Sequence, residues 1–201
     1  MSQRYPTLAQ LGLLLGSLTL AACSGGGGDT APTTNNTVNT GGGTTGTATA
    51  PVLFAGDNGT NGIELWRTDG TATGTKMVKD INTIADSSPA PAVTINGVTY
   101  FVAFDGVHGY ELWKSNGTAA GTVLVKDIYP EGDYYSIPED LFAFNGKLYF
   151  TADAGVPGRE LWRSDGTAAG TVMVKDFTAG EMGSASGPFA VMNNVMYFKA
   201  G

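Results

Sequence analysis

The feature that most constrains this chain is a 17-residue segment that the sequence contains three times. The copies begin at Glu64, Glu111 and Glu160 and read ELWRTDGTATGTKMVKD, ELWKSNGTAAGTVLVKD and ELWRSDGTAAGTVMVKD. Successive copies start 47 and 49 residues apart, a period that is typical of repeat proteins in which each copy is one supersecondary unit. Because one such unit cannot bury its apolar face alone, neighbouring units must stack. The sequence therefore predicts a fold of repeated, stacked units.

Composition narrows both the fold class and the function. The chain of 201 residues holds 30 glycines and few helix-forming runs, which favours an all-β, turn-rich protein. Its net charge of −7 argues against a nucleic-acid partner, which needs a basic face to meet phosphates. A single cysteine excludes an intrachain disulfide and a cysteine metal cluster. A single histidine excludes a histidine-rich zinc site and leaves little for a Ser-His-Asp triad.

The first 22 residues have the form of a signal peptide. Arg4 lies in a short polar start, and residues 8–20 form an apolar run that is short for a bilayer span. The following Leu20-Ala21-Ala22-Cys23 resembles the bacterial lipobox. This resemblance implies cleavage before Cys23 and a diacylglycerol on its sulfur, with acyl chains such as palmitate holding the protein to the membrane. The alternative is a plain secretory signal with a chance cysteine.

The resemblance to lipoproteins also implies a location. Ser24, rather than an aspartate, follows Cys23. In a Gram-negative source this favours the outer membrane or the cell surface, and in any bacterium the expected site is the cell envelope. Residues 23–50 are rich in Gly and Thr and carry almost no large apolar side chain. They cannot offset the entropy of ordering, so we expect a disordered tether with a reach of roughly 30 Å.

Residues 51–201 divide into units of four short strands. In the unit from Leu141, LFAFN and KLYFTA flank the hairpin signal Asn145-Gly146, and RELWRS and TVMVKDF follow. Four antiparallel strands in chain order are typical of one propeller blade. Units begin near 52, 94 and 141, and a partial unit begins at 189, which makes thirteen strands. We predict an all-β, propeller-like array of about three four-stranded blades in an incomplete ring, with a β-trefoil as the alternative.

The repeated motif resembles a named group, the bacterial ELWxxDGT-repeat proteins. ELWRTDGT, ELWKSNGT and ELWRSDGT carry the likeness over about residues 52–201, and only Asn116 departs from the aspartate of the pattern. The resemblance implies a propeller-like, extracytoplasmic protein and no agreed biochemical activity.

Leucine and tryptophan recur at one position in each unit. Such positions favour a structural core between units, and a ring of aromatic ligand contacts is the alternative. The residues are Leu65, Trp66, Leu112, Trp113, Leu161 and Trp162.

Carboxylates repeat with the scaffold as well. Paired carboxylates can cleave glycosidic bonds, but an active site needs one asymmetric group of residues, so we assign no catalytic residue. An aspartate in an Asp-Gly turn commonly binds its own backbone. The alternative is calcium, with Asp69 and Asp165 as the candidate ligands, and no other cofactor is predicted.

The connections between units differ from one another, as recognition loops on a rigid scaffold do. One of them is rich in tyrosine, which suits contact with protein or carbohydrate; a plain solvated loop is the alternative. Its candidate ligand-binding residues are Tyr129, Glu131, Asp133, Tyr134 and Tyr135. We therefore expect a lipid-anchored binding or adhesion module for a protein or glycan, with a surface enzyme acting on polysaccharide as the alternative. Uncovered blades at either end also predict self-association through open edges.

Overall fold

The structure is a computed structural model that describes residues 51–130, 135–156, 158–177, 180, 183 and 185–200. The chain divides into two units, 1–45 and 46–201, and every described residue belongs to the second. The predicted signal peptide (1–22) and tether (23–50) lie outside the described residues. Across the described ranges, no helix has the length and apolar character that a bilayer span requires.

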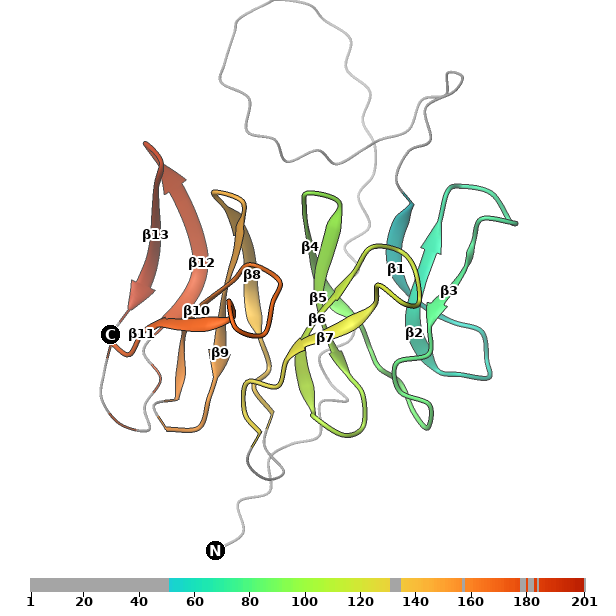
Figure 1. Cartoon of the computed structure of the whole chain (residues 1–201), viewed down its shortest axis with the longest axis horizontal. Helices are drawn as coiled ribbons and strands as arrows, with labels where there is room; N and C mark the ends of the chain where they lie inside the picture. Colours follow the sequence, from blue (N-terminus) through green and yellow to red (C-terminus); the bar gives the residue numbers. More distant parts are fainter. Residues whose placement is uncertain are drawn as a thin grey trace, which may run out of the picture. The chain divides into compact units, whose positions relative to one another are not determined.

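The described residues form thirteen strands in four antiparallel sheets, in which hydrogen-bonded neighbours follow chain order. Sheet I contains β1 (Val52–Asp57), β2 (Ile63–Thr68) and β3 (Lys76–Lys79). Sheet II contains β4 (Ala90–Ile95), β5 (Val98–Phe104), β6 (Tyr110–Ser115) and β7 (Val123–Lys126). Sheet III contains β8 (Glu139–Phe144), β9 (Lys147–Asp153), β10 (Arg159–Ser164) and β11 (Val172–Lys175). Sheet IV contains β12 (Ala185–Met192) and β13 (Val195–Ala200). Figure 1 shows these sheets standing in a row in chain order.

The first hairpin of sheets II, III and IV turns on two residues in the left-handed region. Asn145 and Gly146 have φ of 49° and 72°, which confirms the predicted hairpin between β8 and β9. The same conformation occurs at Asn96-Gly97 and at Asn193-Asn194. Asparagine and glycine tolerate positive φ, and two such residues form the turn whose twist matches the strands on either side.

Each Glu-Leu-Trp strand carries one bulge at the same place. The register with the following strand shifts between Leu65 and Trp66, between Leu112 and Trp113, and between Leu161 and Trp162. A bulge inserts one extra residue and bends the strand locally. The repeated sequence therefore reproduces an irregular detail as well as the strands themselves.

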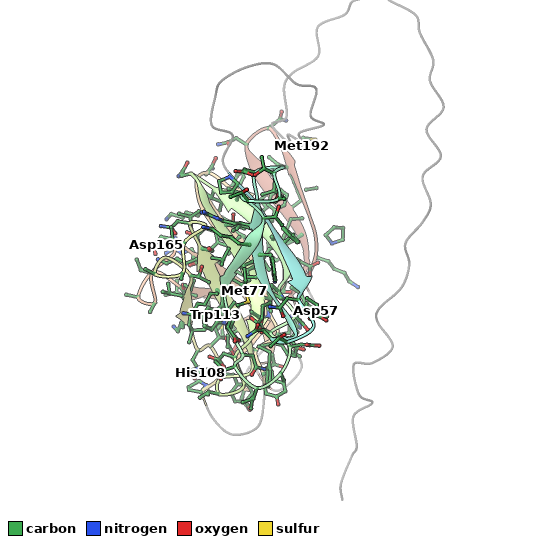
Figure 2. All side chains as sticks on the ribbon, turned by 90° about the vertical axis from the view of Figure 1, so that its right-hand side faces the viewer. Asp57, Met77, His108, Trp113, Asp165 and Met192 are labelled. Atoms are coloured by element: carbon green, nitrogen blue, oxygen red, sulfur yellow. The ribbon has the colours of Figure 1, made fainter. Side chains whose placement is uncertain are left out.

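Apolar cores lie between consecutive sheets. Between sheets I and II, Leu65, Val78 and Ile81 pack with Phe101, Ala103 and Trp113. Between sheets II and III, the equivalent residues are Leu112, Val125 and Ile128 against Phe150, Ala152 and Trp162. Trp113, which belongs to the core between sheets I and II, is labelled among the packed side chains in Figure 2. Because burying apolar surface contributes about 25 cal/mol per Å², the packing of these sheets against each other is the main contribution to the stability of the fold.

Basic side chains join the sheets beside these cores. Lys79 donates from Nζ to the carbonyl oxygen of Thr122 (3.0 Å) and lies 5.6 Å from the ring centre of Trp113. Lys126 repeats both contacts, with Thr171 (2.9 Å) and Trp162 (5.6 Å). A second link runs from Arg67 to the Gly117 carbonyl oxygen (3.1 Å) and from Lys114 to that of Gly166 (2.7 Å).

The sequence-based fold class is confirmed at the level of an all-β protein built from small antiparallel sheets. The described strands number three, four, four and two by sheet, as the sequence predicts. They form neither a closed propeller nor a closed barrel, so the β-trefoil alternative finds no support in this part of the chain.

Candidate functional site

The glutamate of each Glu-Leu-Trp motif fastens the connection to the next sheet. Glu64 is fully buried and accepts hydrogen bonds from the backbone N–H of Ile81 (2.7 Å) and from the N–H and Oγ of Ser87 (3.1 and 2.7 Å). Ser87 in turn accepts a hydrogen bond at its carbonyl from the N–H of Phe104 in β5 (2.9 Å). One carboxylate thereby holds both ends of the connection and ties sheet I to sheet II.

Glu111 repeats this arrangement one unit later. Its carboxylate accepts hydrogen bonds from the N–H of Ile128 (3.0 Å) and from the N–H and Oγ of Ser136 (3.3 and 2.7 Å). Asp153 of β9 donates its N–H to the Ser136 carbonyl (2.9 Å). Burial raises the pKa of Glu111 to about 7, although hydrogen bonds from Ser136 and Ile128 lower it. Glu160, the third equivalent, is also fully buried.

The candidate tyrosine loop therefore starts and ends on residues that Glu111 holds. Tyr135 packs on two aromatic rings of sheet II, with centroids 5.8 Å from Phe104 and 6.2 Å from Tyr110. It also lies close over the backbone of Gly109, which leaves no room for a Cβ there. The Tyr135 side chain is nevertheless 41% exposed. The Tyr135 ring is therefore partly exposed to solvent while its position is fixed by the residues it packs against.

Tyr129, at the other end of the loop, lies against the next sheet. A Cβ on Gly155 would come within 2.8 Å of its ring, so Tyr129 covers the β9–β10 connection of sheet III. The structure places Tyr129 and Tyr135 on neighbouring sheets. Glu131, Asp133 and Tyr134, the other predicted loop residues, lie outside the described residues.

The candidate calcium ligands lie in exposed turns. Asp69 Oδ1 accepts hydrogen bonds from the N–H and Oγ1 of Thr71 (2.9 and 2.7 Å), and Asp165 makes the same pair with Thr167 (2.9 and 2.7 Å). These hydrogen bonds from threonine lower the pKa of both carboxyls. In the described part of the chain, no group of three or more His, Cys, Asp or Glu residues has a geometry that fits a metal ion. The local hydrogen bonds account for both aspartates as turn residues.

The predicted core residues are enclosed to different degrees. Leu65, Leu112 and Leu161 are buried, as are Trp113 and Trp162, whereas Trp66 of sheet I is half-buried. The difference follows position, because no sheet in the described part of the chain precedes sheet I and covers its tryptophan.

Sequence reasoning missed an ion pair beside the loop. His108 Nδ1 lies 2.7 Å from Asp105 Oδ2, and this hydrogen bond raises the pKa of His108. Burial raises the pKa of Asp105, but hydrogen bonds from His108 and Val107 outweigh burial and lower it overall. The spacing of Asp105 and His108 in a Gly-containing turn was the available signal. Figure 2 places His108 among the loops at the lower end of the view.

A second feature that the sequence did not indicate is an open cleft of about 460 Å³ between sheets II and III. Tyr100, Lys114, Asn116 and Asp165 give it a polar lining. Burial, together with the nearby charge of Asp165, raises the pKa of Tyr100. The Nζ atom of Lys114 already donates a hydrogen bond to the Gly166 carbonyl oxygen. The other polar groups of the lining include Asn116 and Asp165, which lie in the equivalent turns of sheets II and III.

Comparisons of the chain with known protein families, with curated proteins and with solved structures gave no match.

Proposed function

We propose that this protein is a lipid-anchored, extracytoplasmic binding module that presents the connections between its sheets to a protein or glycan. The sheets would be the blades of a propeller of the ELWxxDGT type, and the lipid would be on Cys23. The observation that carries the proposal is the support beneath Tyr135. Buried Glu111 holds both ends of the connection, and Phe104 and Tyr110 hold the ring of Tyr135, so little ordering of that side chain remains to oppose binding.

Tyrosine is suited to this role because it offers a large, amphipathic contact area with few rotatable bonds. The cleft lies at the opposite end of β5 and β6 from Tyr135 and is a separate candidate contact. It offers an amide at Asn116 and a carboxylate at Asp165, groups that can pair with hydroxyls of a sugar or with peptide backbone. By contrast, Glu64 and Glu111 are enclosed and bound to backbone and serine donors. Their surroundings support a structural role and give no support to the polysaccharide-cleaving alternative.

The test is a binding screen of the full chain on a printed oligosaccharide array and, in parallel, on immobilised extracellular proteins of a bacterial culture. Tyr135→Ser should weaken the strongest interaction at least tenfold. Ile84→Ser is the matched control, because Ile84 is an exposed apolar residue in the equivalent connection of sheet I. Equal effects of the two substitutions, or release of sugar from the array, would contradict the proposal.

A further inference from the structure

The cleft between sheets II and III combines an apolar wall with polar groups from two turns. All of its lining residues belong to the described part of the chain. Its volume of about 460 Å³ lies within the roughly 300–1,000 Å³ that small-molecule sites occupy. Val98 and Val123 give the apolar part of the lining, and the polar part comes from β5, β6 and the turns that follow β6 and β10. The cleft therefore has the size and the mixed lining of a small-molecule site.

A buried tyrosine presents an unpaired hydroxyl to this cleft. Tyr100 is only 7% exposed, and its ring belongs to the core between sheets II and III. The hydroxyl lies against the backbone of Gly166, yet no described residue forms a hydrogen bond with it. Polar groups of buried side chains normally have hydrogen-bond partners. The Tyr100 hydroxyl is therefore available to a ligand that enters the cleft.

The two turns hold their polar side chains in fixed positions. Asn116 Oδ1 accepts hydrogen bonds from the N–H and Oγ1 of Thr118 (3.1 and 2.7 Å), which leaves Nδ2 as a donor. Asp165 Oδ1 accepts the same pair from Thr167 (2.9 and 2.7 Å), which leaves Oδ2 as an acceptor. Each side chain also lies over the backbone of the glycine five residues further along. Because these groups are already held in place, a ligand does not have to order them.

The same scaffold builds a different surface between sheets I and II. By strand register, Leu53 takes the place of Tyr100, and Lys76 takes the place of Val123. Leu53 has no hydroxyl and packs against the core, and Lys76 is exposed and charged. The tyrosine hydroxyl and the apolar wall are therefore features of the cleft between sheets II and III and not of every junction in the repeat.

The charges at the cleft favour a neutral ligand. Hydrogen bonds from Thr167 lower the pKa of Asp165, so its carboxylate is negative at neutral pH. Lys114 is positive, and its Nζ donates to the Gly166 carbonyl oxygen (2.7 Å). An anion would meet Asp165 and a cation would meet Lys114. A neutral hydroxyl both donates and accepts, so it can pair with the Asp165 carboxylate and with the Asn116 amide.

We propose that this cleft binds one neutral sugar unit of a glycan. The sugar hydroxyls would pair with Tyr100, Asn116 and Asp165, and its C–H groups would lie against Val98 and Val123. The inference rests on the proposed function, because it names a ligand class for a binding module, but it assigns a second site.

This site is separate from Tyr135. Tyr135 lies over Gly109, next to His108, and Figure 2 shows Asp165 well above His108. The cleft and the Tyr135 ring therefore lie toward opposite ends of sheet II, and each can be tested without the other.

NMR titration of the full chain tests the ligand class. The neutral probes are the methyl glycosides of glucose, galactose and mannose. At least one should shift the side-chain amide of Asn116 and the N–H of Gly166, whereas glucuronate and glucosamine should bind at least tenfold more weakly because they are charged. No shift of these two amides with any neutral glycoside, or equal binding of the charged sugars, would overturn the proposal. Shifts with triglycine alone would assign the cleft to peptide and overturn it too.

Two substitutions with matched controls test the contacts. Tyr100→Phe removes only a hydroxyl, and Asn116→Asp removes a donor while introducing the residue that the other two copies of the repeat contain. Each should weaken binding of the best glycoside at least tenfold. Tyr149→Phe and Asp69→Asn change the equivalent positions of sheets III and I, and both should leave the affinity unchanged. Equal losses in variants and controls, or no loss in either variant, would overturn the assignment.

Tyr135→Ser distinguishes this site from the one under the proposed function. It should leave the glycoside titration unchanged. Loss of the glycoside shifts in this variant would overturn the cleft as a separate site. If glycoside binding persists while Tyr135→Ser has no effect on the array, the cleft is supported and only the role of Tyr135 is contradicted.

Discussion

At the scale of single residues, the buried glutamates explain why the repeat retains a charged residue at a core position. Glu64 and Glu111 satisfy backbone donors at two separate points of a connection that has no regular structure. Buried backbone N–H groups must find partners, and a carboxylate with two oxygens can serve several at once. The Glu-Leu-Trp motif therefore forms a strand and, through its glutamate, also joins that strand's sheet to the next one.

The raised pKa of Glu111 predicts a pH dependence of stability. The pKa rises from 4.5 to about 7 on folding, so the stabilising contribution is complete below about pH 4.5 and is lost as the pH rises through 7. The free energy of unfolding should fall by up to about 3 kcal/mol across this window. Glu111→Gln should remove that fall, and urea denaturation at several pH values measures it. His108 also has a raised pKa and contributes in the same direction. The main cause, its hydrogen bond to Asp105, is present in both proteins, whereas the smaller effect of the Glu111 charge on His108 is lost in the variant. Identical pH profiles for the two proteins would contradict the assignment.

The position of a tryptophan in the stack should decide the cost of removing it. Trp113→Ala should lower the free energy of unfolding by about 3–5 kcal/mol, because the ring is buried between two sheets and Lys79 lies over it. Trp66→Ala should cost about half as much, since its outer face is uncovered. Denaturation of both variants at low protein concentration compares them, and equal losses would argue against the stacking order.

At the scale of elements, the lysines that end β3 and β7 link their sheets to the next sheet. Lys126→Gln removes the hydrogen bond to the Thr171 carbonyl and the contact with the Trp162 ring. We expect a loss of about 1–2 kcal/mol in the free energy of unfolding. Lys175→Gln is the matched control and should stay within about 0.5 kcal/mol in dilute, monomeric protein. A loss at Lys175 as large as that at Lys126 would show that the contact with the next sheet is not the cause.

At the scale of the whole molecule, the location proposal rests on Cys23. Cys23→Ser should abolish incorporation of a palmitate analogue in a bacterial host and release the protein from the membrane fraction, because two acyl chains anchor a protein almost permanently. Ser24→Ala is the control and should keep its label. Undiminished labelling of the Cys23→Ser variant would remove the basis for the proposed anchor.

Local sequence determined the strands, their hairpins and their number. Asn145-Gly146 selects its turn through positive φ, and the repeated ELWxxDGT segment specifies a strand, a bulge and an Asx turn each time it occurs. These features depend on neighbours within a few residues. They could be predicted because the same short-range chemistry appears three times in one chain.

Only the tertiary structure decided which side chains serve the contacts between sheets. The sequence shows three equivalent lysines, yet Lys79 and Lys126 bind the next sheet while Lys175 does not. It likewise could not show that Glu111 holds the tyrosine connection or that a cleft opens beside Tyr100. Identical local sequences take different roles because burial and hydrogen bonding are set by the sheet that stacks against them, and that neighbour comes from a distant part of the chain.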